Sequence, residues 1–332
     1  MKDVIKEIGD DYATVANKID DTERTVDTGS YILNALVSGS VFGGVSGNKI
    51  TAIAGETSTG KTYFSLAIVK NFLDKHPDGG VMYFDTESAI TKGLLESRGI
   101  DLERVGIINV VTIEQFRNRA LTVVDKYLGL EESDRKPMMF VLDSLGMLST
   151  EKEIKDALDD KQVRDMTKSQ LVKGAFRMLT LKLGQANVPL IVTNHTYDVI
   201  GAYVPTKEMG GGSGLKYAAS TIIYLSKGKE KDGTEVIGNI IKAKTVKSRL
   251  SRENRQVSIR LYYDERGLDR YYGLLDLAEK HGVIKKVANR YEIDGKKVYA
   301  KEIYKNPEKY FTPELMQALD EVSVKEFTYG GE

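Results

Sequence analysis

Short apolar runs recur along the chain, and segments with helical periodicity separate most of them. The runs have the length of β-strands and read ITAIA, VMYFD, VGIINVV, PMMFVLD and VPLIVTN. The segments between them include KTYFSLAIVKNFL and IEQFRNRALTVVDKYL, whose apolar positions follow a helical repeat. Strands that alternate with helices predict a parallel sheet, and nearly continuous apolar strands predict helices on both of its faces. The predicted fold class is α/β.

The pattern changes after about Ser220. TIIYLSKG, EVIGNIIKAK and RQVSIRLYYD are strand-like and are separated by turn residues, which predicts antiparallel hairpins that extend the same sheet. From Tyr272 onward, GLLDLAEKHGVIKK and TPELMQALDEV are helical, with YEIDGKKVYA as a small hairpin between them. We therefore expect a polar, partly helical arm over residues 1–30 as a subunit contact, a core over 31–270 and a small α+β lobe over 271–332.

Composition narrows the possible functions. The 332 residues are 41% hydrophobic and include no cysteine, which excludes disulfides, thiolate metal sites and cysteine nucleophiles. Three histidines argue against a zinc enzyme. The amino terminus has no apolar run of signal-peptide length, and no stretch is long enough to span a bilayer, so we expect a cytoplasmic protein with no membrane partner.

Net charge is zero, so only local charge can attract nucleic acid. Lys plus Arg and Asp plus Glu both count 48. The segment IKAKTVKSRLSRENRQVSIR nevertheless forms a basic ribbon with a single acid, Glu253. A ribbon of this kind is also compatible with a solvated strand edge that lysines protect from aggregation.

The stretch GETSTGKT follows the apolar run KITAIA and precedes a helical segment. It fits the P-loop pattern, in which backbone N–H groups wrap the phosphates of a nucleotide. The loop lysine neutralises the β- and γ-phosphates, and the last hydroxyl ligates Mg²⁺. The predicted ATP and Mg²⁺ site comprises Gly55, Glu56, Thr57, Ser58, Thr59, Gly60, Lys61 and Thr62.

Carboxylates at two other strand ends complete the predicted ATP site. Asp143 ends the apolar strand of PMMFVLDS and is the candidate Walker B aspartate, which would hold the metal together with Thr62. VMYFDTES supplies Asp85 and Glu87 as candidates to orient water, and we favour Glu87. Because parallel strands end at one edge of a sheet, either acid can reach the phosphates. Taken singly, these acids are also compatible with a helix cap and a solvated loop.

The order of these motifs resembles that of the RecA-type recombinases, most closely the UvsX branch of T-even-like phages. It runs GETSTGKT, YFDTES, FVLDS, VPLIVTNHT and MGGGSGLKYAAS, and DSLGMLSTEKEIKDALDDKQVRDMT, NHTYD and GLLDLA are similar to the phage branch. The resemblance covers about Thr28 to the C-terminal lobe. It implies a RecA-like P-loop ATPase core.

The resemblance also implies roles for individual residues. Glu87 matches the family's catalytic glutamate, and His195 lies where the family keeps a polar residue that senses the γ-phosphate. Lys247 and Arg249 align with a basic pair that reaches the ATP of a neighbouring subunit in the filament. Departures occur at Thr91 and Leu94, where relatives hold adenine, and at the C-terminus, which ends in FTYGGE rather than a long acidic tail.

Two further stretches match the family's DNA-contacting loops, residues 150–168 and 197–215. Single-strand binding combines positive charge with planar groups and with glycines that let backbone approach phosphates. The residues that meet this description are Arg164, Lys168, Tyr197, Tyr203, Lys207, Gly210, Gly211 and Gly212. We rank Arg164 and Lys207 first and expect sequence-tolerant binding that weakens steeply with salt.

The expected function is ATP-dependent DNA strand exchange. The protein would form a helical filament on single-stranded DNA, pair that strand with homologous duplex DNA, and act with a loader protein and single-strand-binding protein as possible partners. A hexameric replicative helicase with the same core is one alternative. A DNA-binding regulator gated by ATP without useful hydrolysis is the other, although intact Lys61 and Glu87 argue against it.

Overall fold

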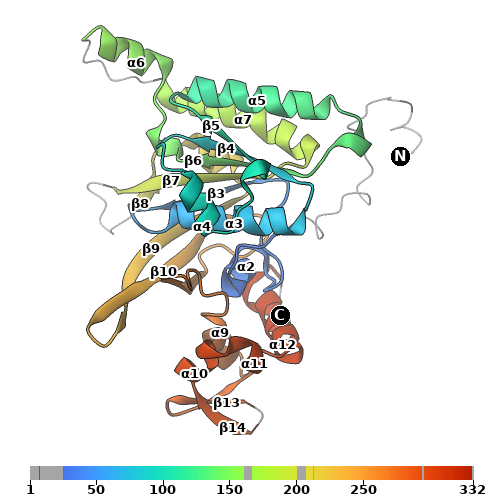
Figure 1. Cartoon of the computed structure of the whole chain (residues 1–332), viewed down its shortest axis with the longest axis vertical. Helices are drawn as coiled ribbons and strands as arrows, with labels where there is room; N and C mark the ends of the chain where they lie inside the picture. The colour runs from blue at the N-terminus through green and yellow to red at the C-terminus, as the bar shows by residue number, and fades with distance from the viewer. Residues whose placement is uncertain are drawn as a thin grey trace.

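A parallel sheet forms the centre of the protein (Figure 1). The computed structural model describes residue 7 and residues 25–160, 167–199, 207–211, 213–293 and 295–330. The parallel strands run in the spatial order β5-β4-β6-β7-β3. Their bounds are β3 (Ile50–Gly55), β4 (Gly80–Asp85), β5 (Val105–Asn109), β6 (Met138–Asp143) and β7 (Leu190–Asp198). The five predicted strands are confirmed.

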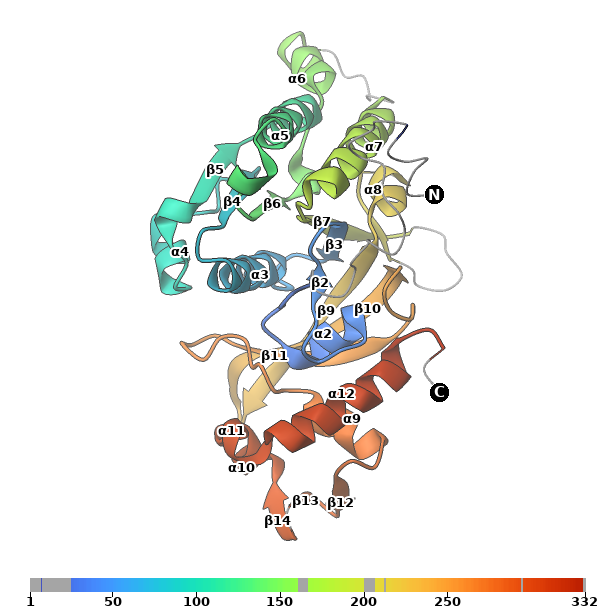
Figure 2. The ribbon, with the colours of Figure 1, turned by 90° about the vertical axis from the view of Figure 1, so that its right-hand side faces the viewer.

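Helices cover both faces of this sheet, as the apolar strands predicted (Figure 2). One face packs against α3 (Lys61–Lys75) and α4 (Lys92–Ser97), and the other against α5 (Ile113–Leu128) and α7 (Lys168–Ala186). Every residue of β3 is buried because side chains on both of its faces meet helices. The sheet is therefore rigid where its strands end, which is where the predicted site lies.

The antiparallel extension is also confirmed. β9 (Thr221–Asp232) pairs in parallel with β3, and β10 (Glu235–Ser248) and β11 (Gln256–Tyr262) follow as antiparallel strands. Buried Ile241 and Ala243 alternate with exposed Lys242 and Lys244 along β10. Since side chains of a strand alternate between its faces, the ribbon presents lysines on one face and packs the core with the other.

Two short strands near the amino terminus, β1 (Thr25–Val26) and β2 (Val45–Ser46), pair with each other, and the helix α2 (Tyr31–Ser38) lies between them in the sequence. The elements after β11 are α9 (Leu274–Lys280), β12 (Lys285–Val287), β13 (Arg290–Ile293), β14 (Lys296–Tyr299), α10 (Ala300–Lys305), α11 (Pro307–Tyr310) and α12 (Pro313–Phe327). The hairpin β13–β14 and the helices α9 and α12 were predicted. Most of the arm over residues 1–30 lies outside the described residues.

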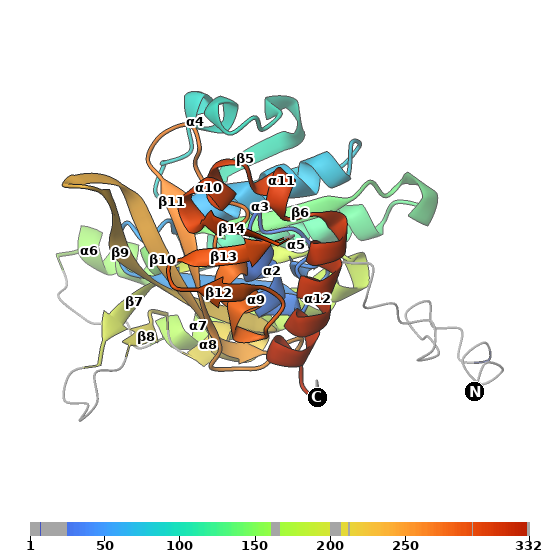
Figure 3. The same ribbon diagram turned by 90° about the horizontal axis from the view of Figure 1, so that it is seen from below.

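The C-terminal lobe packs against the core through buried side chains. Figure 3 shows α12 beside α9 and α2, and apolar side chains of all three helices belong to one buried cluster. Arg260 of β11 adds a polar link: its guanidinium lies 2.6 Å from the carboxylate of Asp269 and covers the rings of Tyr272 and Tyr304 at 4.5 and 4.9 Å. No helix in the described part of the chain is long and apolar enough to cross a membrane.

Candidate nucleotide and DNA site

The predicted catalytic positions lie at one edge of the parallel sheet. Gly55 at the end of β3 is in register with His195 of β7, and Asp85 at the end of β4 is in register with Asp143 of β6. Parallel strands place their carboxyl ends together, so four separate motifs meet at this edge. The sequence prediction that these groups share one site is consistent with this register.

The P-loop connects β3 to α3 in a conformation that needs small residues. A side chain at Gly55 would meet Thr59 Oγ1 at 2.6 Å and the Leu225 carbonyl oxygen at 2.7 Å. Gly60 caps α3 with a φ of +86°, a conformation that glycine adopts without steric cost. Thr59 Oγ1 donates to the Glu56 carbonyl at 2.8 Å and closes the loop. The result is a cradle of backbone groups at the amino end of a helix.

The side chain of Lys61 folds back onto the first residues of the P-loop. Its ammonium donates to the carbonyl oxygens of Gly55 at 3.0 Å and Glu56 at 2.9 Å. Burial lowers the pKa of Lys61, and the nearby carboxylates of Asp143 and Glu87 act in the opposite direction. A phosphate in the cradle would offer this ammonium better acceptors than two neutral carbonyls.

Asp143 is held by two hydroxyl groups from neighbouring strands. Tyr83 Oη donates to Asp143 Oδ2 at 2.7 Å, and Thr193 Oγ1 donates to Asp143 Oδ1. All three side chains are buried. Burial, followed by the charge of Asp143, raises the pKa of Tyr83 well above its ordinary value. The tyrosine therefore stays protonated and donates, and the carboxylate stays aimed at the edge of the sheet.

The two acids after β4 have different surroundings. Asp85 is 3% exposed, and its carboxylate accepts backbone N–H groups of Glu87 at 3.0 Å and Ile90 at 3.1 Å. Glu87 is exposed, accepts a hydrogen bond from Ser144 Oγ at 2.8 Å, and lies 3.7 Å from His195 Nε2. Asp85 is thus occupied as a cap of the following turn. The geometry favours Glu87, the acid that the sequence analysis preferred, as the group free to meet water.

These residues fit Mg²⁺ and ATP. Hard divalent cations take oxygen ligands, and the half-buried hydroxyl of Thr62 and the carboxylate of Asp143 supply them. The cradle has no room for a Cβ atom at Gly55, so a side chain there would disrupt the turn in which the P-loop motif binds phosphates through backbone N–H groups. Thr57 and Ser58 form the exposed tip of this loop.

His195 is connected through backbone to the glycine-rich segment. β7 continues to Asp198 and pairs with β8 (Lys207–Met209), so the predicted loop over 197–215 begins as a hairpin and ends in α8 (Ser213–Ala218). Gly210 donates its N–H to the His195 carbonyl at 3.1 Å, and Asn194 Nδ2 donates to the Gly210 carbonyl at 2.9 Å. A shift of His195 would therefore move Gly210 and its neighbour Gly211.

The candidate DNA residues are only partly described. Tyr197 is 58% exposed on β7, and Lys207 forms an ion pair with Glu56 of the P-loop. Arg164, Tyr203 and Gly212 lie outside the described residues. Residues 150–168, expected as a loop, include a helix, α6 (Glu151–Leu158), because Thr150 and Glu153 form a reciprocal capping box. Lys168 begins α7 and lies 3.4 Å from the carboxylate of Glu153.

Lys247 lies near the end of β10 and contacts α8, and Arg249 directly follows β10. The Lys247 ammonium donates to the carbonyls of Lys216 at 2.7 Å and Tyr217 at 3.1 Å, at the carboxyl end of α8. Burial and the adjacent Arg249 lower the pKa of Lys247. Arg249 has an exposed side chain. Among the described residues, neither cation pairs with the P-loop of its own chain.

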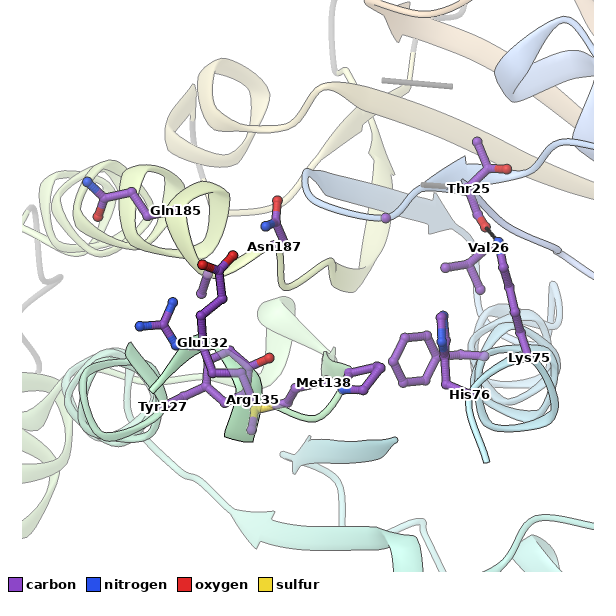
Figure 4. Close-up of a pocket in the computed structure, with 14 residues that line it drawn as sticks. Thr25, Val26, Lys75, His76, Tyr127, Glu132, Arg135, Met138, Gln185 and Asn187 are labelled. Atoms are coloured by element: carbon purple, nitrogen blue, oxygen red, sulfur yellow. Dashed lines mark hydrogen bonds between the residues drawn. The ribbon is translucent and has the colours of Figure 1, made fainter. Parts of the chain in front are cut away.

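A cavity of about 360 Å³ lies at the opposite edge of the sheet (Figure 4). It is bordered by the last residues of α3 and α7 and the first residue of β6, including Lys75, His76, Ala186 and Met138. Parallel strands begin at this edge and end at the P-loop edge. This cavity is consequently separate from the predicted nucleotide site.

Comparison with known proteins agrees with this site. A sequence profile of the RecA N-terminal domain matches residues 1–269. The chain belongs to the RecA family. This RecA-family chain is 33% identical over 274 residues to the recombination and repair protein of Enterobacteria phage T4, which covers 82% of the chain and 68% of that protein. It is 30% identical to protein RecA of Paracoccus denitrificans, over 85% of the chain and 75% of that protein.

The family assignment confirms the resemblance drawn from the motifs. A second bacterial relative, protein RecA of Paenarthrobacter aurescens, is 28% identical over 83% of the chain and 76% of its own length. Sequence reasoning nevertheless missed three site residues of this RecA-family chain: Tyr83, Ser144 and Thr193. Each lies within or directly after an apolar strand, where a hydroxyl group is an ordinary occurrence, so no local signal could have found them.

Proposed function

We propose that this protein is a DNA-dependent ATPase that forms filaments on single-stranded DNA and exchanges DNA strands. One observation carries the proposal: the P-loop, Asp143, Glu87 and His195 share one edge of the sheet, and His195 is hydrogen-bonded through its backbone to the glycine-rich segment. A nucleotide at this edge would be sensed directly by the segment expected to contact DNA.

The chain's own residues account for the binding of ATP. Backbone N–H groups of the P-loop and the positive end of the α3 dipole receive the β- and γ-phosphates. Lys61 exchanges its two carbonyl partners for phosphate oxygens. Thr62 and Asp143 would hold Mg²⁺, which would neutralise charge on the phosphates. Tyr83 and Thr193 keep the Asp143 carboxylate oriented throughout.

Glu87 orients the attacking water in this proposal. Its carboxylate is exposed, while the hydrogen bond from Ser144 fixes one of its oxygens. His195, 3.7 Å from that oxygen, can meet either Glu87 or the γ-phosphate. When the γ-phosphate attracts His195, the bond between the His195 carbonyl and Gly210 transmits the movement to the glycine-rich segment.

In the assembled filament, a neighbouring subunit would supply further positive charges to the ATP site. Lys247 and Arg249 do not contact the P-loop of their own chain among the described residues, which supports a role at the ATP of a neighbouring subunit. Hydrolysis would then require a filament. The arm over residues 1–30 remains a predicted subunit contact. The exposed lysines of β10 offer a sequence-independent surface for DNA phosphates.

The relatives favour strand exchange over the alternatives. The T4 protein is named for recombination and repair, and the bacterial relatives are named RecA. A hexameric helicase and a non-hydrolysing regulator share the P-loop but not these relatives. A loader protein and single-strand-binding protein remain predicted partners.

The test combines ATP hydrolysis with negative-stain microscopy. Wild-type protein is measured without DNA, with single-stranded DNA and with duplex DNA, and Lys61→Ala serves as the control without nucleotide binding. We expect single strands to stimulate hydrolysis and to yield helical filaments, and Glu87→Gln to keep the filaments while losing hydrolysis. Closed rings of fixed size would support a helicase instead, and DNA binding without any hydrolysis would support the regulator.

A further inference from the structure

The turn that carries Arg249 is attached to the last residues of α12. Arg252 donates its backbone N–H to the Phe327 carbonyl at 2.5 Å, and Glu253 donates its N–H to Tyr329 Oη at 3.4 Å. The Arg255 guanidinium lies 3.5 Å from Glu326 Oε1. The turn between β10 and β11 therefore contacts the end of the C-terminal lobe through Arg252, Glu253 and Arg255.

Hydrogen bonds within the turn hold its residues together, so the contacts with the C-terminal lobe constrain the conformation of the whole turn. Glu253 Oε1 accepts the N–H of Ser248 at 3.2 Å, and Ser248 Oγ accepts the N–H of Ser251 at 2.9 Å. Arg249 donates its N–H to the Ser220 carbonyl at 3.0 Å. Displacement of Glu253 would thus be passed to Ser248 and from there to its neighbours Lys247 and Arg249. Displacement of Arg255, whose carbonyl accepts the N–H of Thr245 at 3.0 Å, would be passed to the end of β10 just before Lys247.

Glu326 is well placed to act as an anchor. Its side chain is 11% exposed and also accepts hydrogen bonds from Lys280 at 2.7 Å and His281 at 3.2 Å, both from the α9 region. Although burial opposes ionisation, Lys280, Arg255 and His281 outweigh it and lower the pKa of Glu326. The carboxylate is charged at neutral pH and fixed to the lobe on one side and to the turn on the other.

We propose that the end of α12, residues 326–329, is a positioning element that holds Lys247 and Arg249 in the orientation needed at the ATP of the neighbouring subunit. The proposal rests on the function proposed above. Within the described part of the chain, these lobe residues contact the turn and not the predicted nucleotide site. Substitutions in residues 326–329 should therefore slow hydrolysis at the ATP site of the neighbouring subunit, while ATP binding by the same chain stays unchanged.

The first test uses a double variant, Glu326→Gln with Tyr329→Phe, and a separate Arg255→Gln. The double variant removes two contacts from the lobe side, and Arg255→Gln removes one from the turn side without disturbing Lys280 or His281. Glu321→Gln is the matched control because it makes the same change at an exposed position of α12. ATP affinity, thermal unfolding and kcat on single-stranded DNA are measured for each protein.

We expect kcat to fall about threefold to fivefold in the double variant and less in Arg255→Gln, since partly exposed pairs are worth about 1 kcal/mol or less each. ATP affinity should match that of Glu321→Gln. A kcat equal to that of Glu321→Gln in both variants would overturn the proposal while leaving the wild-type function intact. Absence of DNA-stimulated hydrolysis in the wild type would instead refute the proposed function, and this inference with it.

Filaments that contain two variants distinguish a positioning role from a general loss of folding in the variant. Glu87→Gln subunits are expected to enter filaments without hydrolysing ATP, and they present an intact basic pair to their neighbours. With Glu87→Gln in excess, turnover per double-variant site should rise to the value of wild-type sites in the same mixture, because the defect lies in what the variant offers its neighbour. If turnover per site stays low in the mixture, the end of α12 supports only the variant's own fold, and the positioning role is wrong.

Discussion

Tyr83→Phe measures the energy of a buried hydrogen bond to Asp143, the candidate Walker B aspartate. Tyr83 is fully buried, and its hydroxyl donates to Asp143 Oδ2 at 2.7 Å. The substitution removes one oxygen atom and leaves the ring packed against its neighbours. A hydrogen bond to a charged group contributes about 1.5–3 kcal/mol, so the free energy of unfolding should fall by about 2 kcal/mol.

Tyr127→Phe provides the matched control. Tyr127 is 9% exposed, and its hydroxyl donates to the Lys136 carbonyl at 2.8 Å, so the donor is the same and the distance similar while the acceptor is neutral. A neutral hydrogen bond contributes about 1 kcal/mol. The midpoint of thermal unfolding should fall by about 2 °C per kcal/mol, which gives Tyr83→Phe about twice the shift of Tyr127→Phe.

Thermal and urea unfolding of the three proteins at neutral pH is the assay. Because the folded state raises the pKa of Tyr83, its contribution is fully present below the ordinary tyrosine pKa of 10.0 and is lost as the pH rises above that value. The difference between wild type and Tyr83→Phe should therefore shrink in alkaline buffer. Equal shifts for Tyr83→Phe and Tyr127→Phe at neutral pH would refute the reasoning that the charge of Asp143 strengthens this bond.

Three further predictions follow from the contacts described. Lys247→Ala should abolish DNA-stimulated ATP turnover while ATP affinity measured by titration stays unchanged, and unchanged turnover would contradict its role at the neighbouring site. The logarithm of the affinity for single-stranded DNA should fall linearly with the logarithm of salt concentration, as measured by fluorescence anisotropy, and a slope near zero would exclude phosphate contacts. Arg260→Gln should lower the free energy of unfolding by about 2 kcal/mol because it removes the cation from the largely buried carboxylate of Asp269, which keeps the backbone N–H groups of Tyr271 and Tyr272, whereas Arg266→Gln, whose exposed cation covers the ring of Tyr262, should change urea unfolding little.

The sequence alone predicted the strands of the sheet and a nucleotide-binding motif, although it missed the helix α6. Apolar runs such as ITAIA and PMMFVLD predicted strands covered on both faces, and GETSTGKT placed a phosphate-binding turn directly after the first of them. Asp143 was recognisable because it ends a strand. All of these signals are local: the period of the side chains, the glycines and the charges lie within a few residues of one another.

Tertiary structure alone decided which groups meet. Asp85 and Glu87 are two residues apart and chemically alike, and only the fold uses Asp85 as a backbone cap and leaves Glu87 exposed. The hydroxyls of Tyr83 and Thr193 reach Asp143 because β6 lies between β4 and β7. The end of α12 meets the turn after β10 across a long stretch of chain. Such pairings depend on strand order, register and the docking of the lobe, and no short segment of the sequence encodes them.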